Sequence, residues 1–412
     1  MFLIKMAFRN LARHKKRTIY TAVVIAVAIG FYVFADALVL GMMDASYENV
    51  TEFEYGHTQI TSQKYWEERE EYPLEDLIKV DERIHSKIMS NSEVVGTSPR
   101  LDFNAELNDG QMGLPVVGRG IDVSNEKSIS RIDKSILKGG FITEGESKAV
   151  MGQNLANDML LDVGDSFMLV VRTREKTFNV IDLTISGLFE TPNPQINNNF
   201  VFVPIEIAQN ALGVGDNYSH LAIKLTDRSQ TENTTLYINS LLKNENSSYR
   251  AYSWEEAAED LIKMQEYSDA MLYLMLGIIL LLAVVGIINT VILSILERFK
   301  EIGMMKAMGM QIKEITFVLA LEAGGIGVIG GIIGCLLGGL GVYLLSTFGI
   351  NIYAGMEGEF DLPISMAIIY GNWNYGAFIF VFTYSIIVSF IVGLIPAYWG
   401  ARIEPAELLH HK

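Results

Sequence analysis

The sequence is poor in the residues and motifs that usually carry chemistry. It has one cysteine, Cys335, so an internal disulfide framework is excluded, and it has no Gly-Lys dipeptide, which excludes a phosphate-binding P-loop. Its six histidines form no set with metal-ligand spacing apart from the pair His410-His411, which we interpret as solvated side chains. The 48 Asp and Glu residues outnumber the 32 Lys and Arg residues, which argues against a nucleic-acid-binding surface. We therefore expect no catalytic residues, no metal site and no nucleic-acid partner.

Apolar residues are abundant and lie in four long runs. Hydrophobic residues make up 50% of the chain, and a helix that crosses a bilayer needs about 20 mostly apolar residues in succession. The runs that meet this length are residues 18–40, 270–296, 315–348 and 376–398. The first run contains a passable signal-peptidase site at Ala26-Val27-Ala28, but it is longer than the roughly 7–15 residues of a signal-peptide core. We predict four transmembrane helices, of which the first is an uncleaved anchor.

Basic residues flank these runs in a pattern that predicts their orientation. They lie before the first run, between the second and third, and after the fourth, at Lys5, Arg9, Arg13, Lys15, Lys16, Arg17, Arg298, Lys300, Lys306, Lys313, Arg402 and Lys412. Basic flanks stay in the cytoplasm, and a chain that crosses four times places all three groups there. Residues 1–17 also carry apolar and basic faces at helical spacing, which predicts a cytoplasmic interfacial amphipathic helix; a plain basic flank is the alternative. Residues 41–269 and a short loop at 349–375 then lie outside the cytoplasm.

Residues 41–269 have the pattern of a water-facing domain. Residues 41–270 contain 38 acidic and 20 basic side chains, in contrast to the apolar ends of the chain. Helical patterns cover 76–89, 229–245 and the stretch from Trp254, which we expect to continue into the second transmembrane helix. Turn residues separate strand-like runs at 149–151, 167–171, 181–188, 200–203 and 221–225. The predicted fold is an α-helical membrane domain with four transmembrane helices plus a mixed α/β extracytoplasmic domain.

The third apolar run is dense in glycine. Gly330, Gly334 and Gly338 recur every four residues, as do Gly327 and Gly331. Small residues at this spacing allow helix backbones to approach closely in lipid. We therefore predict tight helix packing, either within one subunit or across a dimer.

A charged segment, residues 296–309, connects the second and third apolar runs and reads LERFKEIGMMKAMG. Its charged side chains keep it out of lipid. Ile302, Met305 and Met308 supply an apolar anchor, while Gly303 and Gly309 permit close approach and a helix stop. The segment predicts a short cytoplasmic helix, with an ordinary charged loop as the alternative.

This segment resembles the E-R-x-x-E-I-G-x-x-[KR]-A-x-G motif of the FtsX-like, or MacB-type, ABC transporter permeases. Residues 7–18, 152–165 and 395–409 are also similar to segments of that family, in the same order, so the resemblance covers essentially the whole chain. It implies a MacB-like core domain and the following boundaries: 1–17 interfacial helix, 18–40 first transmembrane helix, 41–269 periplasmic domain, 270–296 second transmembrane helix, 297–314 coupling helix, 315–348 third transmembrane helix, 349–375 outer loop, 376–398 fourth transmembrane helix and 399–412 cytoplasmic tail.

The resemblance also implies partners and a mechanism. In these permeases the charged segment is the coupling helix that docks on an ABC ATPase, which assigns this contact to Glu297, Arg298, Glu301, Ile302, Gly303, Met305, Lys306, Ala307 and Gly309. The implied protein lies in the bacterial inner (cytoplasmic) membrane and carries no cofactor, because ATP and Mg²⁺ belong to the separate ATPase. It forms a dimer with a second copy or a homologous permease, and ATP hydrolysis moves its periplasmic domain mechanically.

Within the family, the chain length and residues 56–60, GHTQI, are most similar to the LolC/LolE group, which extracts lipoproteins from the inner membrane. LolC carries a long hairpin that captures a periplasmic chaperone, whereas residues 172–176 leave room only for a short turn. A LolE-like half or a homodimeric relative therefore fits better. The implied partners are lipoprotein cargo, membrane lipid and a periplasmic chaperone. MacB-like efflux of peptides, toxins or small molecules and FtsX-like signalling to a cell-wall hydrolase are the alternatives.

The first transmembrane helix supplies a candidate substrate surface for such a permease. Acyl chains that enter beside it would meet Phe31, Phe34, Asp36 and Leu38, for which core packing is the alternative. Asp36 and Glu322 are the ionisable residues within the four runs, and intramembrane carboxylates are candidates for function. Solvation of Asp36 at the outer end and contact of Glu322 with the cytoplasmic interface are the simpler alternatives.

Overall fold

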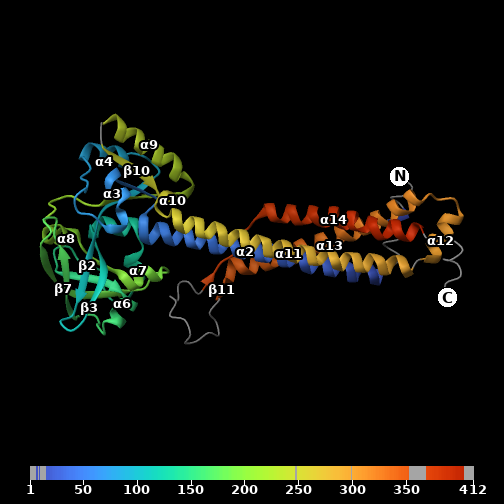
Figure 1. Ribbon diagram of the computed structural model, residues 1–412, viewed down its shortest axis with the longest axis horizontal. Helices are drawn as coiled ribbons and strands as arrows, with labels where there is room; N and C mark the ends of the chain where they lie inside the picture. The colour runs from blue at the N-terminus through green and yellow to red at the C-terminus, as the bar shows by residue number, and fades with distance from the viewer. Residues whose placement is uncertain are drawn as a thin grey trace. The chain divides into compact units, whose positions relative to one another are not determined.

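The computed structural model describes residues 6–7, 9, 15–245, 248–297, 299–351 and 368–402 (Figure 1). Within these residues the chain divides into two compact units. The helical unit contains the described residues up to Asp44 together with 264–351 and 368–402, and the α/β unit contains 45–245 and 248–263. Arg298, most of the predicted interfacial helix and most of the predicted cytoplasmic tail lie outside the described residues.

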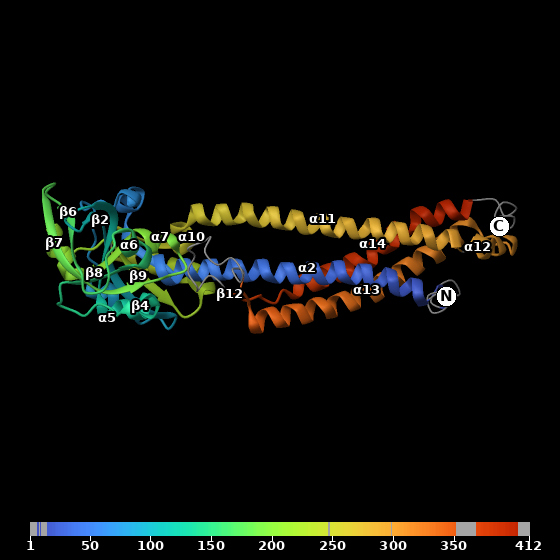
Figure 2. The same ribbon diagram turned by 90° about the horizontal axis from the view of Figure 1, so that it is seen from below.

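Four long helices form the helical unit: α2 (Lys15–Asn49), α11 (Glu259–Glu297), α13 (Ile312–Phe348) and α14 (Tyr375–Arg402). Figures 1 and 2 show them running alongside one another. All four are long and apolar enough to cross a membrane, which confirms the prediction of four membrane helices. The short helix α12 (Phe299–Ala307) follows α11, and strands β11 (Ile350–Asn351) and β12 (Ile368–Ile369) pair antiparallel.

The glycines of α13 bring this helix against two neighbours. A Cβ atom added at any of three glycines would come within 2.7–2.8 Å of a side chain of α2, in the pairs Gly330–Ile25, Gly334–Ile29 and Gly338–Val33. On another face of α13, Gly327 and Gly331 lie against Ser385 of α14. Because only glycine fits such short separations, the glycine spacing serves packing within this chain.

The α/β unit is built on a sheet of ten strands. Their spatial order is β10-β1-β9-β2-β3-β8-β5-β7-β4, and β6 pairs with both β2 and β7. Neighbouring strands are antiparallel except for β3–β8 and β5–β7, which are parallel. The strands are β1 (Thr58–Ser62), β2 (Val94–Asn108), β3 (Gly113–Ile121), β4 (Ile136–Gly139), β5 (Lys148–Gly152), β6 (Ser166–Arg172), β7 (Phe178–Phe189), β8 (Phe200–Pro204), β9 (His220–Leu225) and β10 (Tyr249–Ser253).

Short helices cover this sheet and close its apolar cores. One core includes side chains of β2, β5–β8, α6 and α8, and another includes side chains of β1, β9, α4 and α9. The helices are the π-helix η1 (Val50–Tyr55), which continues α2, and then α3 (Gln63–Glu67), η2 (Arg69–Glu71), α4 (Glu82–Met89), α5 (Val123–Ile129), η3 (Ile132–Ser135), α6 (Gln153–Asp158), α7 (Pro194–Asn199), α8 (Ile205–Leu212), η4 (Arg228–Gln230), α9 (Thr231–Asn244) and α10 (Trp254–Ala257).

The mixed α/β prediction is confirmed, with differences in detail. The five predicted strand segments lie within β5 to β9, but β1 to β4 and β10 were not predicted. The helix predicted at 76–89 begins only at Glu82, because Asp81 is extended and its carboxylate accepts the N–H of Arg83 as an N-cap. The helix predicted from Trp254 does not run straight into α11. It breaks at Ala258, where the backbone leaves helical geometry at φ −102° and ψ 27°.

Candidate functional site

Helix α12 is the structural form of the predicted coupling segment. Glu297 ends α11, and the nine residues of α12 follow. The helix stops at Gly309, whose φ of +92° lies in the left-handed region that favours glycine. The N–H of Met310 then donates to the carbonyl of Met305 at 3.1 Å, and α13 begins at Ile312. The predicted segment thus contains a short helix that is followed by a tight turn.

One face of α12 packs inward. Ile302 is fully buried and Met305 is 5% exposed, and both belong to the apolar core of the helical unit. Gly303, which follows Ile302, is also buried. These three predicted contact residues therefore fix α12 to α13 and α14 and do not lie on its outer surface.

The opposite face of α12 is exposed and apolar. Met304 is 52% exposed and Met308 is 76% exposed, and Ala307 is exposed beside them. Their spacing of three and four residues places them on one side of the helix. Glu301 and Lys306 are half-buried at its edges. Met304 was not among the predicted contact residues, although its spacing from Met308 indicates a shared face.

The candidate substrate surface on α2 is not a continuous exposed patch. Phe31 is 51% exposed, whereas Phe34 and Leu38 are half-buried. Asp36 is only 2% exposed, and its Oδ2 atom accepts a hydrogen bond from the Nδ2 atom of Asn374 at 2.9 Å. Asp36 is therefore buried and hydrogen-bonded, and it is not a solvated side chain at the end of the helix. Glu322 is also buried, at 4% exposed.

A network of buried charges in the α/β unit was not foreseen from the sequence. Asp102 and Arg119 are directly paired across β2 and β3, and the guanidinium donates to both carboxylate oxygens at 2.7 and 2.9 Å. Arg100, two residues before Asp102 on β2, donates two hydrogen bonds to the carboxylate of Glu126 on α5, at 2.5 and 3.2 Å. Charged residues are almost never buried unless they are paired, so alternate charged positions in strands are a usable sequence signal. That signal was missed because β2 and β3 themselves were missed.

The network controls the ionisation of its carboxylates. Burial favours the neutral form of Asp102 and so acts to raise its pKa. The attraction of the adjacent Arg119 guanidinium is larger than this effect and holds the pKa of Asp102 below its usual range. Burial likewise opposes the charge on Glu126, and Arg100 holds the pKa of Glu126 low. Both pairs are therefore ionised at neutral pH, and each partner depends on the other.

The same cations hold the end of the α2–η1 helix. Arg100 and Arg119 both donate to the backbone oxygen of Glu54, at 2.7 and 3.2 Å. Glu52, two residues earlier, pairs through Oε2 with Lys224 at 2.5 Å and with Arg131 at 3.3 Å. Carbonyls at the end of a helix lack helical partners and carry partial negative charge, so cations stabilise this end. We call these four basic residues the η1 clamp.

Two family models match the chain. The MacB-like periplasmic core domain matches residues 18–240, which is more than half of the chain, and the FtsX-like permease C-terminal domain matches residues 273–405. Helix α12 and the glycine-rich α13 lie within the second match. Among the residues that the structure describes, no group of three or more His, Cys, Asp or Glu side chains is placed to hold a metal ion.

Three relatives illustrate the match. An uncharacterized ABC transporter permease of Methanocaldococcus jannaschii is 26% identical over 66% of this chain and 65% of its own length. The lipoprotein-releasing system transmembrane protein LolC of Xylella fastidiosa is 23% identical over 79% of both chains. The macrolide export ATP-binding/permease protein MacB of Nitrobacter winogradskyi is 25% identical over 66% of this chain and 40% of its own length. The chain belongs to the FtsX-like ABC transporter permeases that carry a MacB-like periplasmic core domain.

Proposed function

We propose that this protein is the permease subunit of an ABC transporter that extracts lipoproteins from the bacterial inner membrane. A separate ATPase would hold ATP and Mg²⁺, and its hydrolysis cycle would move the α/β unit mechanically on the periplasmic side. The permease would work as a dimer with a second copy or a homologous permease. A periplasmic chaperone would receive the cargo.

The observation that carries this proposal is the two-faced helix α12. Its outer face presents Met304, Ala307 and Met308, an apolar surface of the kind that docks on a partner protein. Its inner face is locked into the helical unit through Ile302 and Met305. Because packed interiors are nearly incompressible, a displacement of α12 by the ATPase would be passed to the helices on which it packs.

The connections between the two units support mechanical coupling. The unit boundaries fall at Asp44/Ala45 within α2 and at Lys263/Met264 within α11, so the chain passes from one unit to the other inside helices. The η1 clamp binds the end of the α2–η1 helix within the α/β unit. A movement of α2 along its axis would therefore pull on β2, β3 and β9 directly.

The choice of lipoproteins as cargo rests on the LolC and LolE relatives, which are named for lipoprotein release. The match to LolC covers 79% of that protein, whereas the match to the ATP-binding/permease protein MacB covers 40%. The lipoprotein-releasing relative is thus matched over more of its own length than the export protein.

Depletion of the protein tests the cargo. Inner and outer membranes are separated after depletion, and acylated lipoproteins are counted in each fraction, with re-expression of the wild-type chain as the control. We expect outer-membrane lipoproteins to accumulate in the inner membrane and to leave it on re-expression. Unchanged lipoprotein sorting in fully depleted cells would reject this cargo and favour MacB-like export of another substrate.

A further inference from the structure

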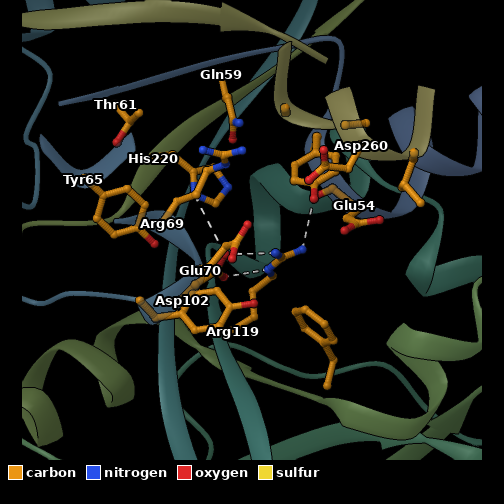
Figure 3. A pocket seen from close by; sticks show the side chains of 16 residues that line it. Glu54, Gln59, Thr61, Tyr65, Arg69, Glu70, Asp102, Arg119, His220 and Asp260 are labelled. Carbon is orange, nitrogen blue, oxygen red and sulfur yellow. Dashed lines mark hydrogen bonds and ion pairs between the residues drawn. The ribbon is translucent and has the colours of Figure 1, made fainter. Parts of the chain in front are cut away.

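A cavity of about 180 Å³ opens within the α/β unit beside the Asp102–Arg119 pair (Figure 3). Its walls come from η1, α3, η2, α10, the start of α11 and the strands β1, β2, β3, β8 and β9. A cavity of about 150 Å³ is known to accommodate a benzene molecule. This space therefore admits a ligand of several non-hydrogen atoms.

The lining of this cavity carries negative charge. Four carboxyl groups and two guanidiniums line it: Glu54, Glu70, Asp102 and Asp260 against Arg69 and Arg119. Burial raises the pKa of the Glu54 carboxyl, so the excess of negative charge comes from Glu70 and Asp260. Both guanidiniums are already engaged, because Arg119 binds Asp102 and Arg69 donates to the carbonyl of Trp66 at 2.9 Å. Among the described residues neither Glu70 nor Asp260 has an ion-pair partner. The charge left without a counter-ion is therefore acidic.

His220 supplies a second and independent sign of a ligand. Its side chain is 6% exposed and lines the cavity, and its Nδ1 atom lies 4.0 Å from Oδ2 of Asp102. Figure 3 shows the ring, Asp102 and Arg119 joined in series by dashed lines. The Nε2 atom is buried without a hydrogen-bond partner. Buried polar atoms are nearly always satisfied, so the site lacks a group that would complete it.

The protonation state of His220 indicates which group is missing. Burial lowers its pKa to about 4, although Asp102 acts in the opposite direction, so the ring is neutral at pH 7. We place its one proton on Nδ1, which faces the carboxylate of Asp102. The Nε2 atom is then a hydrogen-bond acceptor, and it requires an N–H or O–H donor.

We propose that this cavity binds a primary alkylammonium ion, whose N–H group donates to Nε2 of His220 and whose charge is balanced by the acidic lining. Tyr55, Tyr65 and Phe200 in the lining supply aromatic surface for the alkyl chain and for cation–π attraction. An anion would meet uncompensated carboxylates instead. The ammonium group belongs either to a free small amine or to a lysine side chain of a bound protein. The proposal is independent of the transport function proposed above.

A titration calorimetry experiment tests the ligand class. The full-length protein in detergent at pH 7.5 is titrated with n-butylammonium chloride, and in parallel with 1-butanol and sodium butyrate as neutral and anionic probes of the same shape. We expect saturable binding of n-butylammonium alone. Absence of saturable n-butylammonium binding, or equal binding of 1-butanol, would overturn the proposal.

Matched variants place the binding in this cavity. Asp260 is exposed at its rim, so Asp260→Asn should leave the fold intact and weaken n-butylammonium binding about tenfold, because a charge-assisted contact is lost. His220→Gln should weaken it to a similar extent. Glu255→Gln, an exposed carboxylate five residues away and outside the lining, should bind as the wild type does. Unchanged affinity in Asp260→Asn, confirmed as folded by its thermal unfolding, would contradict the assignment.

A further titration distinguishes the two sources of the ammonium group. A short capped peptide with one internal lysine competes with n-butylammonium if the cavity takes a lysine side chain, and the same peptide with acetyl-lysine does not. Lack of competition by the lysine peptide, together with saturable n-butylammonium binding, identifies a free amine as the ligand. Both results uphold the alkylammonium site.

Discussion

Arg100 donates its Nη1–H to the backbone oxygen of Glu54 at 2.7 Å, so a buried strand residue holds the end of a helix that begins at Lys15. The Arg100 side chain is 1% exposed and is fixed at its other edge by Glu126. The bond therefore joins the long α2–η1 helix to the centre of a sheet. Under the function proposed above, this is the connection through which force would enter the sheet.

Loss of Arg100 should unfold the α/β unit more easily. Arg100→Met leaves the buried Glu126 unpaired and removes a donor from Glu54, which should cost about 3–5 kcal/mol of unfolding free energy. Tryptophan fluorescence during urea titration of the detergent-solubilised protein measures the loss. The double variant Arg100→Met/Glu126→Leu should recover much of it. If Arg100→Met were as stable as the wild type, the Arg100–Glu126 pair would contribute little to the unfolding free energy.

The matched control for this prediction is an exposed ion pair of the same unit. Lys87 binds Glu245 at 2.6 Å, but both side chains are substantially exposed. Water and salt screen such pairs. Lys87→Met should therefore leave the urea midpoint unchanged.

The outer face of α12 should be required for ATPase binding. The double substitution Met304→Asp/Met308→Asp places charge on this apolar surface and should weaken association with the ATPase at least about tenfold, since burial of one such side chain contributes about 1.5–3 kcal/mol. Co-purification of the ATPase measures the effect. Met112→Asp, an exposed methionine of the β2–β3 turn, is the control and should bind normally. Full co-purification with the double variant would remove this face from the interface.

Glu301 should be required for coupling rather than for insertion. It lies half-buried at the edge of α12, between the inner and outer faces. Glu301→Lys reverses a charge there and should leave membrane insertion intact while uncoupling ATP hydrolysis from transport. Hydrolysis in proteoliposomes and lipoprotein release are measured in parallel. Full release by this variant, with normal ATPase binding, would contradict the coupling role of α12.

The packing of α13 against α2 should be disrupted when a methyl group is added at the contact. A Cβ atom at Gly334 would lie 2.7 Å from the Cβ atom of Ile29, so Gly334→Ala should force the helices apart and cost about 1–3 kcal/mol. Thermal unfolding in detergent reports the loss. Gly277 on α11 has open space around it, and Gly277→Ala should be neutral or slightly stabilising because alanine favours helix. Equal melting temperatures for the two variants would rule out tight packing at Gly334.

Stability should fall as the pH is lowered from about 6.5 to about 4. Burial lowers the pKa of both His57 and His220 to about 4, while in the unfolded chain each titrates near 6.5. Between these values the unfolded state binds more protons, so the unfolding free energy rises with pH, by up to about 3 kcal/mol for each histidine. Urea midpoints measured across this range should follow that slope. His220→Gln should reduce it, and an unchanged slope would mean that His220 is not neutral in the fold.

Features encoded locally were predictable from the sequence. Runs of apolar residues identify the four membrane helices, because the length of each run alone decides whether it spans a bilayer. The segment 296–309 was predicted as a short helix, and Gly309 ends it because the required φ favours glycine. Five strands of the α/β unit were also predicted, since their apolar residues are continuous or alternate.

Other features depend on contacts between distant parts of the chain. The sequence of α12 gives its apolar residues but not which of them face inward, and packing against α13 and α14 decides that Ile302 is buried while Met308 is exposed. The glycine spacing predicted close packing, but only the fold shows that α2 and α14 are the partners.

The charged network depended most strongly on tertiary structure. Arg119 and Asp102 become partners only when β2 and β3 pair in register, and the two strands were missed because charged side chains and prolines interrupt their apolar pattern. Glu54 and His220 reach the same cavity from elements more than 150 residues apart. The sequence by itself determined the membrane helices and the short helix between the second and third of them, because hydropathy and glycine geometry act over neighbouring residues. Tertiary structure alone decided the η1 clamp and the acidic cavity, because a buried charge is stable only beside a partner that the fold brings to it.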